Sequence, residues 1–574
     1  ASTGAGLLLV AGLLVSGAPT GSAAALGPGG VDVETATIPQ LQRAMDTRKL
    51  TSVALTHFYL DRIQRVDREL LHAVLAVNPD AVDEARASDR RRARGELRGP
   101  LDGIPVLLKD NVDADGMPTT AGSLALAKTQ PDNAFIVDRL ESGGAVIIGK
   151  ANLSEWANFR STQSSSGWSG VGGQTGNPYA LDHNPCGSSS GSGAAIAAHL
   201  ATVAIGTETD GSIVCPSGAN GLVGVKPTLG RVSRTGIVPI SAAQDTAGPM
   251  ARNVTDAAIL LAAVQGADPA DPPTQDVDNP PDYTRFLDEG ALRGARIGVW
   301  RAGNSGVSNE TDAIVDRTVG TLRALGATVV DPADLEGIDD VGGPEFEALL
   351  CEFKHDLNAY LAATPGDHPR TLAELIAFNE RNADREMPFF GQELFEAAQA
   401  TSGDLDDPAC AEPRQTATSL ARQVLDRTLE QHDLDAIIAP TGSPAWPTDV
   451  INGDHFVLGS STPAAVSGYP NITVPAGMAF GLPVGVSFIG AHEAEPTLFA
   501  LAYAFEQATH ARRPPSLPRS APSTDGVRSW PPGGAANPAT APRRTGESFT
   551  TSTTSGVPAG SAVPGARRPY GTTR

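Results

Sequence analysis

The chain has 574 residues, a formal net charge of −22 and 40% hydrophobic residues. This length leaves room for several domains, and the apolar content is sufficient for a large core. The negative charge excludes nonspecific nucleic-acid binding as the main function, because such binding needs a positive surface that neutralises phosphates.

The first residues resemble a secretory signal peptide. The apolar run 6–15 is followed by small residues at 22–25, which is typical of a cleavage site. The run is too short to span a bilayer, so stable membrane insertion is not expected. The alternative is an apolar helix that is buried in the core. We therefore expect residues 1–30 to be a signal-peptide-like segment and the protein to be secreted or extracellular.

Helical and strand-like patterns alternate along most of the chain. Apolar residues recur with the period of a helix at 37–43, 52–67, 79–94, 134–142, 254–264, 312–325, 345–363, 371–383 and 391–400. Short apolar runs predict strands at 72–77, 104–108, 145–148, 296–300, 327–330, 436–439, 472–474 and 484–488. This alternation favours an α/β fold with helices on both faces of a sheet. We interpret the helical stretch 346–432 as an insertion that covers one side of the functional site.

From residue 514 to residue 574 the composition changes to Pro, Gly, Ser, Thr and Ala, with scattered arginines. Apolar periodicity is absent from this stretch. Such a composition cannot bury enough apolar surface to fold, so we expect a disordered tail.

Four cysteines occur in the chain, at Cys186, Cys215, Cys351 and Cys410, without C-x-x-C spacing. A zinc site is therefore poorly supported, and no metal is expected. Export permits disulfides, and Cys351 with Cys410 is a candidate pair. The alternative is free thiols that pack as small apolar side chains.

Lys109 stands at the end of the strand predicted at 104–108. Lysine is scarce in this chain, and unlike arginine it can lose its proton near neutral pH when it is buried. A neutral amine of this kind can act as a general base. The alternative is a solvated lysine that pairs with Asp110 or Asp113.

Two loops rich in glycine and hydroxyl side chains, 187–193 and 207–212, flank one apolar run. That run comprises residues 194–205; its first half is helix-like and its second half is strand-like. Glycine lets backbone N–H groups approach a ligand closely. Loops of this kind suit an oxyanion, which preorganised N–H donors stabilise as it forms.

Three motifs of the chain resemble the amidase signature hydrolases. They are GIPVLLKDN, which contains Lys109, CGSSSGSGAA, which starts at Cys186, and GTETDGSIVCPSGANGLVGVKPT, which starts at Gly206. The stretches SEWANFRS at 154–161 and SGWSGVGGQTGNPY at 166–179 are most similar to bacterial peptide amidases. The resemblance covers residues 38–513 and implies the amidase signature fold, a large mixed central β-sheet covered by helices on both faces. We therefore expect one catalytic domain over residues 31–513.

The resemblance also implies a catalytic set of two serines and one lysine. It assigns the nucleophile to Ser212, the bridging hydroxyl to Ser188 and the base to Lys109. It implies a cis peptide bond between Gly187 and Ser188. The oxyanion would be held by backbone N–H groups, those of Thr209, Asp210, Gly211 and Ser212.

The polar loop 161–174 borders the site in this interpretation, and its residues Trp168 and Gln174 are predicted to contact the substrate. Cys186 and Ser190 stand where many members of the family carry glycine. Both lie beside the motif, so they leave the three catalytic assignments unchanged. The side chain of Asp210 either faces the substrate or caps a turn.

Two other interpretations remain open. The stretch 187–191 fits the G-x-S-x-G elbow of α/β-hydrolases, which would make Ser189 the nucleophile of an esterase and His492 a candidate base. An elbow needs a strand directly before it, and residues 182–185 do not form one. The amidotransferase that acts on glutamyl-tRNA has a catalytic chain that shares the signature, but a signal peptide argues against a role at tRNA.

The expected function is that of a secreted serine amidohydrolase that cleaves carboxylic amides through an acyl-enzyme. The substrate is expected to be a small-molecule or peptide amide, with C-terminal peptide amides as the specific hypothesis. No cofactor and no nucleic-acid partner is expected.

Overall fold

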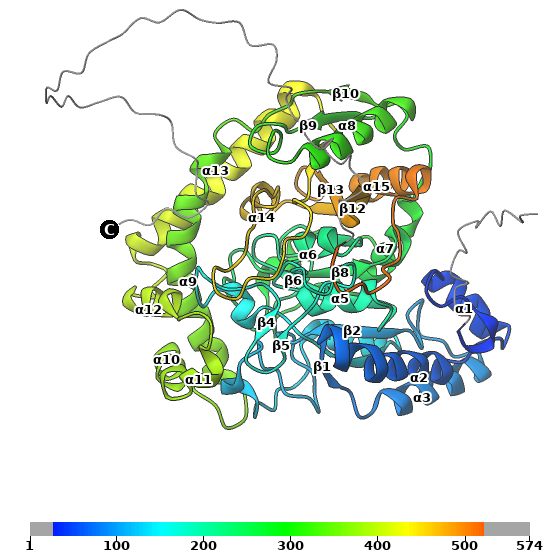
Figure 1. The fold of residues 1–574 in the computed structure, drawn as a ribbon, viewed down its shortest axis with the longest axis horizontal. Coiled ribbons are helices and arrows are strands. Elements are labelled where there is room, and N and C mark those ends of the chain that lie inside the picture. The colour runs from blue at the N-terminus through cyan, green and yellow to red at the C-terminus, as the bar shows by residue number, and fades with distance from the viewer. Residues whose placement is uncertain (1–26, 522–574) are drawn as a thin grey trace, which may run out of the picture. The chain divides into compact units, whose positions relative to one another are not determined.

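The computed structural model describes residues 27–521, and an 11-stranded mixed sheet lies at its centre (Figure 1). The signal-peptide-like segment up to residue 26 and the tail from residue 522 lie outside the described residues, so the predictions for them are not tested. The described chain continues beyond the predicted start of the tail at residue 514. There, Leu181 donates its N–H to the carbonyl of Pro518 at 2.9 Å.

Neighbouring strands follow the order β1-β3-β2-β6-β8-β7-β12-β13-β11-β9-β10. Their bounds are β1 Val74–Val77, β2 Pro105–Lys109, β3 Val146–Ala151, β6 Val203–Glu208, β7 Val223–Lys226, β8 Thr246–Ala251, β9 Arg296–Val299, β10 Thr328–Val330, β11 Ala436–Pro440, β12 Asn471–Ala479 and β13 Leu482–Ile489. Strands β3, β2 and β6 are parallel, as are β11, β9 and β10. The other neighbours are antiparallel. The predicted mixed sheet is therefore confirmed.

The inner strands are covered on both faces. Every residue of β2, β3, β6, β7, β8, β11 and β13 is buried. Since successive side chains of a strand point to opposite faces, this burial requires packing on both sides. Helices α5 and α6 contact one another and the central strands, and α7 contacts α4, α15 and the same sheet.

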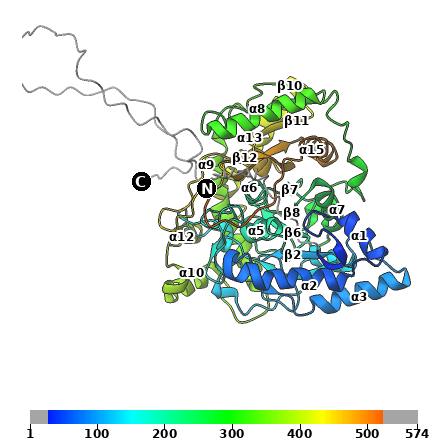
Figure 2. The same ribbon diagram turned by 45° about the vertical axis from the view of Figure 1, so that its right-hand side comes forward.

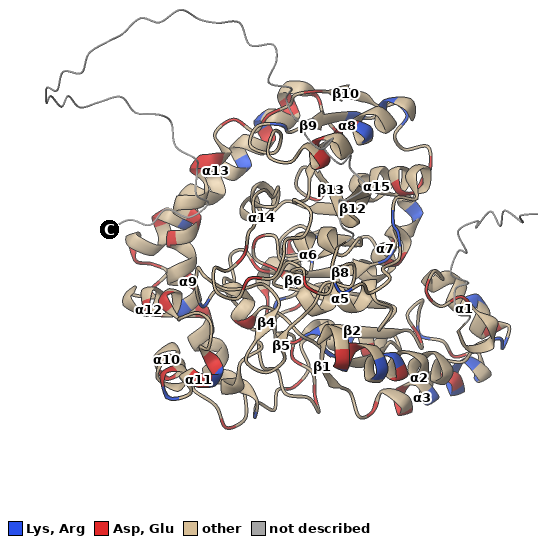
Figure 3. Ribbon diagram, viewed as in Figure 1, with Lys and Arg blue, Asp and Glu red and all other residues tan. Residues whose placement is uncertain are grey.

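The helices are α1 Ile38–Asp46, α2 Ser52–Arg62, α3 Ala81–Arg94, α4 Phe135–Ser142, α5 Ser190–Ala197, α6 Val214–Ala219, α7 Val254–Val264, α8 Asn309–Ala324, α9 Gly342–Ala363, α10 Leu372–Arg381, α11 Ala383–Glu386, α12 Glu393–Ala400, α13 Pro408–His432, α14 Thr462–Ser467 and α15 Glu495–Thr509. Figures 1 and 2 both show α2 and α3 side by side, and these two helices are in contact. Charged residues of both signs lie along α3 and α13 (Figure 3). Within residues 27–521, no helix combines the length and the apolar character that crossing a membrane requires.

The helical insertion predicted at 346–432 corresponds to α9 to α13, drawn in yellow-green at one side of Figure 1. Helices α9 and α13 pack along one another. A hydrophobic cluster joins Phe353 and Phe395 of the insertion to Trp156 and Val238 of the sheet domain. The insertion thus shares a hydrophobic cluster with the segments that follow β3 and precede β8.

Most predicted elements occur within a few residues of their expected bounds. The helix predicted at 52–67 differs, because α2 ends at Arg62 and a π-helical stretch, Ile63–Leu71, follows it. The strand predicted at 472–474 extends over Asn471–Ala479. Strands β7 and β8 are not among the predicted elements, since they lie in motif sequence whose glycine and proline content conceals a strand pattern.

Candidate active site

The amine of Lys109 is fully buried at the end of β2 and has three oxygen neighbours. Its Nζ lies 2.8 Å from Ser188 Oγ, 2.8 Å from Thr207 Oγ1 and 3.1 Å from the carbonyl oxygen of Thr207. The parallel pairing of β2 with β6, in which Leu108 stands opposite Ile205, brings this lysine to Thr207. The alternative of a solvated lysine is therefore wrong.

The carboxylates that were candidate partners of Lys109 have other partners. Asp110 lies 3.3 Å from the amine of Lys150, and Asp113 accepts a hydrogen bond of 2.8 Å from the Tyr360 hydroxyl. Burial lowers the pKa of Lys109 to about 7, although Asp245 and Glu208 act in the opposite direction. Lys109 is thus poised to exchange a proton near neutral pH.

The hydroxyl of Thr207 and the side chain of Asn111 were not among the predicted site residues. Thr207 Oγ1 accepts a hydrogen bond from Asn111 Nδ2 at 2.9 Å as well as the one from Lys109. Asn111 therefore orients Thr207, which in turn fixes the lysine. The adjacency of Asn111 and Thr207 depends on the sheet, since the two residues are 96 positions apart.

Ser188 lies in a tight loop, and the predicted cis peptide bond between Gly187 and Ser188 is present. The carbonyl of Ser188 accepts the N–H of Ser154 at 3.0 Å. A Cβ at position 187 would lie 2.2 Å from Ser154 Oγ, so any larger residue would have to displace that hydroxyl. The loop is held against the segment that follows β3.

Ser212 lies in the turn between β6 and α6. Gly211, directly before it, has φ +79°, a conformation that favours glycine. The carboxylate of Glu208 accepts the N–H groups of Ile213 at 2.7 Å and Val214 at 3.0 Å. The end of β6 thus fixes the turn that carries Ser212. No backbone hydrogen bond within residues 27–521 uses the N–H groups of Asp210, Gly211 or Ser212.

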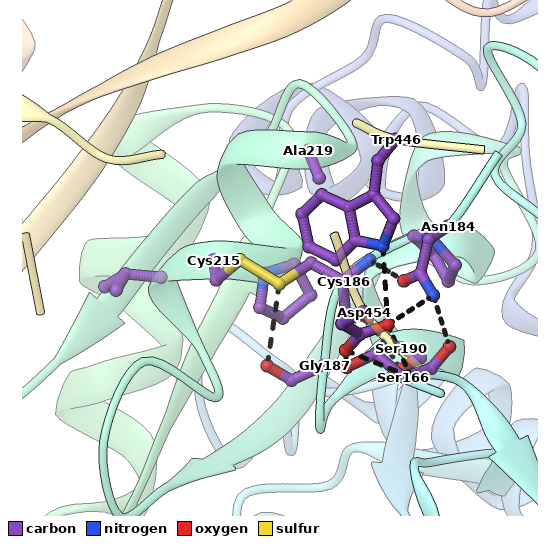
Figure 4. Close-up of a disulfide and its surroundings, with 12 residues drawn as sticks. Ser166, Asn184, Cys186, Gly187, Ser190, Cys215, Ala219, Trp446 and Asp454 are labelled. Carbon is purple, nitrogen blue, oxygen red and sulfur yellow. Dashed lines mark hydrogen bonds between the residues drawn. A yellow bond between two sulfur atoms is a disulfide. The ribbon is translucent and has the colours of Figure 1, made fainter. Parts of the chain in front are cut away.

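The two serine loops are in contact. Ser189 donates its N–H to the carbonyl of Ser212 at 3.2 Å, which places Ser188 beside Ser212. The hydrogen bonds of the described chain do not include one between the hydroxyls of Ser188 and Ser212. Figure 4 shows a disulfide between Cys186, two residues before Ser188, and Cys215 in helix α6, three residues after Ser212. This pair was not predicted, whereas the predicted pair Cys351–Cys410 is present.

A network around Asp454 supports the first loop (Figure 4). Asp454 Oδ1 accepts hydrogen bonds from Asn184 Nδ2 at 2.9 Å and Ser166 N at 3.0 Å. Asn184 Oδ1 in turn accepts the N–H of Cys186 at 2.8 Å, and Ser190 Oγ donates to the Cys186 carbonyl at 2.7 Å. Burial raises the pKa of Asp454. The network connects the loop before Ser188 to two segments that are distant in sequence.

Trp168 and Gln174 lie in the β4–β5 hairpin, Trp168–Ser169 and Gly173–Gln174, and both side chains have partners within the protein. The buried indole of Trp168 packs edge-on against Phe390 at 5.1 Å between ring centroids. Gln174 Nε2 donates to the carbonyls of Ser166 at 2.9 Å and Thr175 at 3.0 Å. These contacts give both residues a role in shaping the loop, and their contact with substrate stays a prediction.

Asp210 belongs to a buried acidic group beside the Ser212 turn. Its Oδ2 accepts a hydrogen bond of 2.7 Å from Thr462. Burial raises the pKa of Asp210 and, together with the charge of Asp210, raises the pKa of Glu345 to about 8. A small cavity has Thr207, whose hydroxyl contacts Lys109, among its lining residues, together with Asn111, Thr209, Asp245 and Ile240.

The elbow interpretation does not fit the geometry of Ser189. The hydroxyl of this fully buried residue donates to the Thr207 carbonyl at 3.1 Å. The residues directly before it form no strand, and His492 is exposed with its ring against Tyr469. The fold instead places the amine of Lys109 2.8 Å from Ser188 Oγ and brings the loop of Ser188 into contact with the carbonyl of Ser212.

Comparison with known proteins agrees with this geometry. A family model described as "Amidase" matches residues 54–499. A probable amidase of Arabidopsis thaliana is 41% identical over 500 residues, which is 84% of this chain and 92% of that protein. A glutamyl-tRNA(Gln) amidotransferase chain of Moorella thermoacetica is 34% identical over 506 residues, 83% of this chain and 98% of that one.

Solved structures extend the likeness to the fold. The native peptide amidase of Stenotrophomonas maltophilia superposes with a TM-score of 0.80 at 50% identity, and the match covers 84% of this chain and 99% of that one. An amidase family protein of Bacillus anthracis gives a TM-score of 0.77 at 38% identity, and the match covers 85% of this chain and 93% of that one.

Proposed function

Because this chain belongs to the amidase family and is an amide-hydrolysing enzyme, we propose that it cleaves its substrate through an acyl-enzyme on Ser212. In this proposal Ser188 relays the proton and Lys109 is the base. The observation that carries the proposal is the distance of 2.8 Å between the buried Lys109 amine and Ser188 Oγ.

The hydrogen bonds of Lys109 explain how the amine can accept a proton. A neutral amine has two N–H donors and one lone pair. Thr207 offers two acceptors, its carbonyl and its hydroxyl, which can take both donors. The lone pair is then directed at Ser188, whose hydroxyl passes on the proton of Ser212. The same path returns the proton to the leaving nitrogen.

The turn at Ser212 supports oxyanion stabilisation. The N–H groups of Asp210, Gly211 and Ser212 have no backbone acceptor within residues 27–521, and Glu208 holds the turn in place. Thr209 directly precedes them and completes the predicted set. Loss of one such donor typically raises a barrier by about 2.7–4 kcal/mol. Water then hydrolyses the acyl-enzyme and releases the carboxylic acid.

For the substrate we propose C-terminal peptide amides. The proposal rests on the 50% identity to the peptide amidase of Stenotrophomonas maltophilia. Turnover should be measured with a panel of substrates, as ammonia release from peptide amides and simple carboxamides, aniline release from anilides and alcohol release from esters. Turnover of peptide amides is expected; turnover of anilides or esters alone would contradict this substrate class.

Paired substitutions test the catalytic assignment. Lys109→Ala is expected to lower kcat/KM by about 10²–10⁴-fold, because general base catalysis contributes this much. His492→Ala is the control, since an elbow mechanism would need that residue and the proposed one does not. A serine-directed fluorophosphonate should label the wild type at Ser212. Labelling at Ser189, or loss of activity in His492→Ala only, would refute the assignment.

A second candidate is ammonia transfer, which the similarity to the amidotransferase of Moorella thermoacetica suggests. The two functions differ in where the ammonia goes. Free ammonia in the medium, at a rate equal to acid formation and without a partner protein, is expected for the hydrolase. Amide cleavage that starts only when a partner is added would favour transfer.

We also propose that the protein is exported. The apolar run 6–15 and the two disulfides support this, because disulfides persist in oxidising compartments. Export predicts activity in the culture medium or periplasm of the producing cells and a mature N-terminus near residue 25. A full-length cytoplasmic product with four free thiols would contradict it.

A further inference from the structure

The buried side chain of Gln244 links the turn of Ser212 to the helical insertion. Gln244 lies in the segment before β8, and its Nε2 donates to the carbonyl of Thr209 at 2.9 Å and to Glu345 Oε1, on α9, at 2.6 Å. Its Oε1 accepts a hydrogen bond from Arg414 Nη1, on α13, at 2.7 Å. The amide nitrogen thus faces two oxygens and the amide oxygen faces a donor, so only one orientation of the amide satisfies all three contacts.

Arg414 is itself held in place by an ion pair with two parallel hydrogen bonds. Its Nε and Nη2 donate to the two carboxylate oxygens of Glu352 at 2.7 Å and 2.6 Å. Glu352 Oε2 also accepts a hydrogen bond of 2.7 Å from the hydroxyl of Ser241, three residues before Gln244. Such a pair fixes the plane of the guanidinium, so the remaining nitrogen, Nη1, has a fixed direction toward Gln244.

The carbonyl that Gln244 anchors belongs to the peptide unit of a predicted oxyanion donor. The pairing of β6 with β8 ends where Glu208 stands opposite Thr246, so Thr209 is the first residue beyond the ladder. The peptide bond between Thr209 and Asp210 is trans, and its C=O and N–H therefore point in opposite directions. The hydrogen bond from Gln244 to the carbonyl thus directs the N–H of Asp210 to the opposite side.

Two other carbonyls of the turn are anchored by backbone N–H groups. The carbonyl of Gly211 accepts the N–H of Cys215 at 2.8 Å, and that of Ser212 accepts the N–H of Ser189 at 3.2 Å. A substitution of a side chain leaves such backbone bonds in place. The contact of Gln244 can therefore be removed while these anchors of the turn remain.

We propose that Gln244 is a positioning residue for oxyanion stabilisation, which holds the peptide between Thr209 and Asp210 so that its N–H faces the developing negative charge. Its partners on α9 and α13 fix Gln244 in turn. The inference rests on the proposed hydrolysis through Ser212. It adds a residue that touches neither the substrate nor the reacting atoms, and that acts because a donor oriented in advance needs no reorganisation during the reaction.

The first test is the steady-state kinetics of Gln244→Ala with a peptide amide. Loss of one oxyanion donor lowers kcat by about 10²–10³-fold, so a donor that is present but misaligned should lower it by roughly 10–100-fold. KM should change by less than about twofold, because the contact strengthens in the transition state and not in the bound substrate. Unchanged kcat in the folded variant would overturn the inference.

Gln392→Ala is the matched control for the loss of a buried glutamine. Gln392 Oε1 accepts a hydrogen bond from Asn379 at 3.0 Å, and its Nε2 donates to the carbonyl of Ile376 at 3.4 Å, so both partners lie on α10 within the insertion. This variant should keep the kcat of the wild type. An equal fall of kcat in Gln392→Ala and Gln244→Ala would show a general effect of destabilisation and overturn the inference.

Gln244→Met separates the hydrogen bond from the volume of the side chain. Methionine fills a similar space but has no N–H donor for the carbonyl of Thr209, so kcat should fall as in Gln244→Ala. Recovery of kcat in Gln244→Met would mean that packing alone matters and would overturn the inference. If neither variant folds, Arg414→Lys, which keeps a charge beside Glu352 but not the fixed guanidinium, should show the same fall of kcat at constant KM, and unchanged kcat there would overturn it.

A peptide aldehyde probes the oxyanion site directly. The oxygen of Ser212 bonds to the aldehyde carbon, the π electron pair moves to the carbonyl oxygen, and the serine proton passes to the base. The inhibition constant of the aldehyde should rise in Gln244→Ala in proportion to the loss of kcat/KM. That of the corresponding peptide alcohol, which has no carbonyl, should stay the same. An equal rise for both ligands would overturn the inference.

Labelling with the serine-directed fluorophosphonate distinguishes this inference from the proposed function. Absence of label at Ser212 in the wild type would refute both. Label at Ser212, together with unchanged kcat in folded Gln244→Ala and Gln244→Met, would refute only the role of Gln244.

Discussion

At the scale of single residues, burial decides the chemistry of Lys109. The side chain is fully buried, and its three oxygen neighbours come from two other segments of the chain. A solvated lysine would be protonated at neutral pH and unable to act as a base. Enclosure beside Ser188 and Thr207 brings its pKa to about 7.

This pKa predicts the pH dependence of catalysis. The base must be neutral, so kcat/KM should fall as pH decreases through about 7 and Lys109 becomes protonated. Thr207→Val removes one acceptor that stabilises the ammonium form, so its inflection should move to lower pH. The check is a pH profile of kcat/KM with a peptide amide. An inflection near the ordinary lysine pKa in both proteins would contradict this role.

A second residue-scale prediction concerns Glu155, which shares its buried site with Glu386 and Arg160. Its Oε1 lies 3.1 Å from Arg160 Nη1, yet burial and the neighbouring Glu386 raise its pKa to about 8. The folded state therefore holds a proton on Glu155 that the unfolded chain loses near its ordinary pKa of 4.5. This contribution to stability is fully present below that value and is lost as pH rises through about 8.

Glu155→Gln imitates the protonated form, so the stability of this variant should fall less than that of the wild type as pH rises. The free energy of unfolding of the wild type should fall by on the order of 1–3 kcal/mol more than that of the variant between pH 5 and pH 9. Urea titrations at several pH values measure the difference. Parallel pH curves for the two proteins would show that Glu155 is ionised in the fold.

At the scale of elements, the turn of Ser212 and the loop of Ser188 depend on contacts between segments. Glu208, at the end of β6, accepts the N–H of Ile213 and so fixes the start of α6. Asp454 accepts a hydrogen bond from Asn184 and so fixes the chain before Ser188. The disulfide Cys186–Cys215 links the residues just before Ser188 to helix α6, which begins two residues after Ser212. Each loop alone is short and rich in glycine, so its conformation depends on these links.

The disulfide predicts an effect on catalysis. A protein with Cys186→Ser and Cys215→Ser should fold but show a lower kcat with little change in KM, because the two serines lose their common support. Steady-state kinetics of the double variant, at a temperature at which it is folded, measure kcat and KM separately. Unchanged kcat in the folded variant would mean that the other contacts suffice to position the serines.

At the scale of the whole molecule, the described chain combines the sheet with the helical insertion α9–α13. Their shared hydrophobic cluster contains Trp156 and Val238 from the sheet domain. Cys351–Cys410 fastens α9 to α13 over a sequence separation of 59 residues. This disulfide lies outside the serine loops, so it serves as the matched comparison for Cys186–Cys215.

Cys351→Ser with Cys410→Ser should reduce stability without impairing catalysis. Removal of a disulfide that closes a loop of this length typically destabilises by about 2–4 kcal/mol. We expect a loss of that order in urea unfolding and a kcat/KM near the wild-type value. A large fall in kcat would indicate that the insertion also shapes the site.

Sequence by itself determined the class of fold, the position of most elements and the identity of Lys109, Ser188 and Ser212 as candidates. The class of fold and most elements follow from the period of apolar residues, whereas the three catalytic candidates follow from the resemblance of the motifs to the amidase signature family. The candidate pair Cys351–Cys410 was also within reach, whereas Cys186–Cys215 was not, since any pairing depends on which cysteines the fold brings within about 6 Å.

Only the tertiary structure decided which side chains surround the amine. Thr207 contacts both Lys109 and Asn111 because β2 runs parallel to β6, a pairing between segments far apart in sequence. Burial and proximity set the charge state of such groups, and both arise only when distant segments pack together.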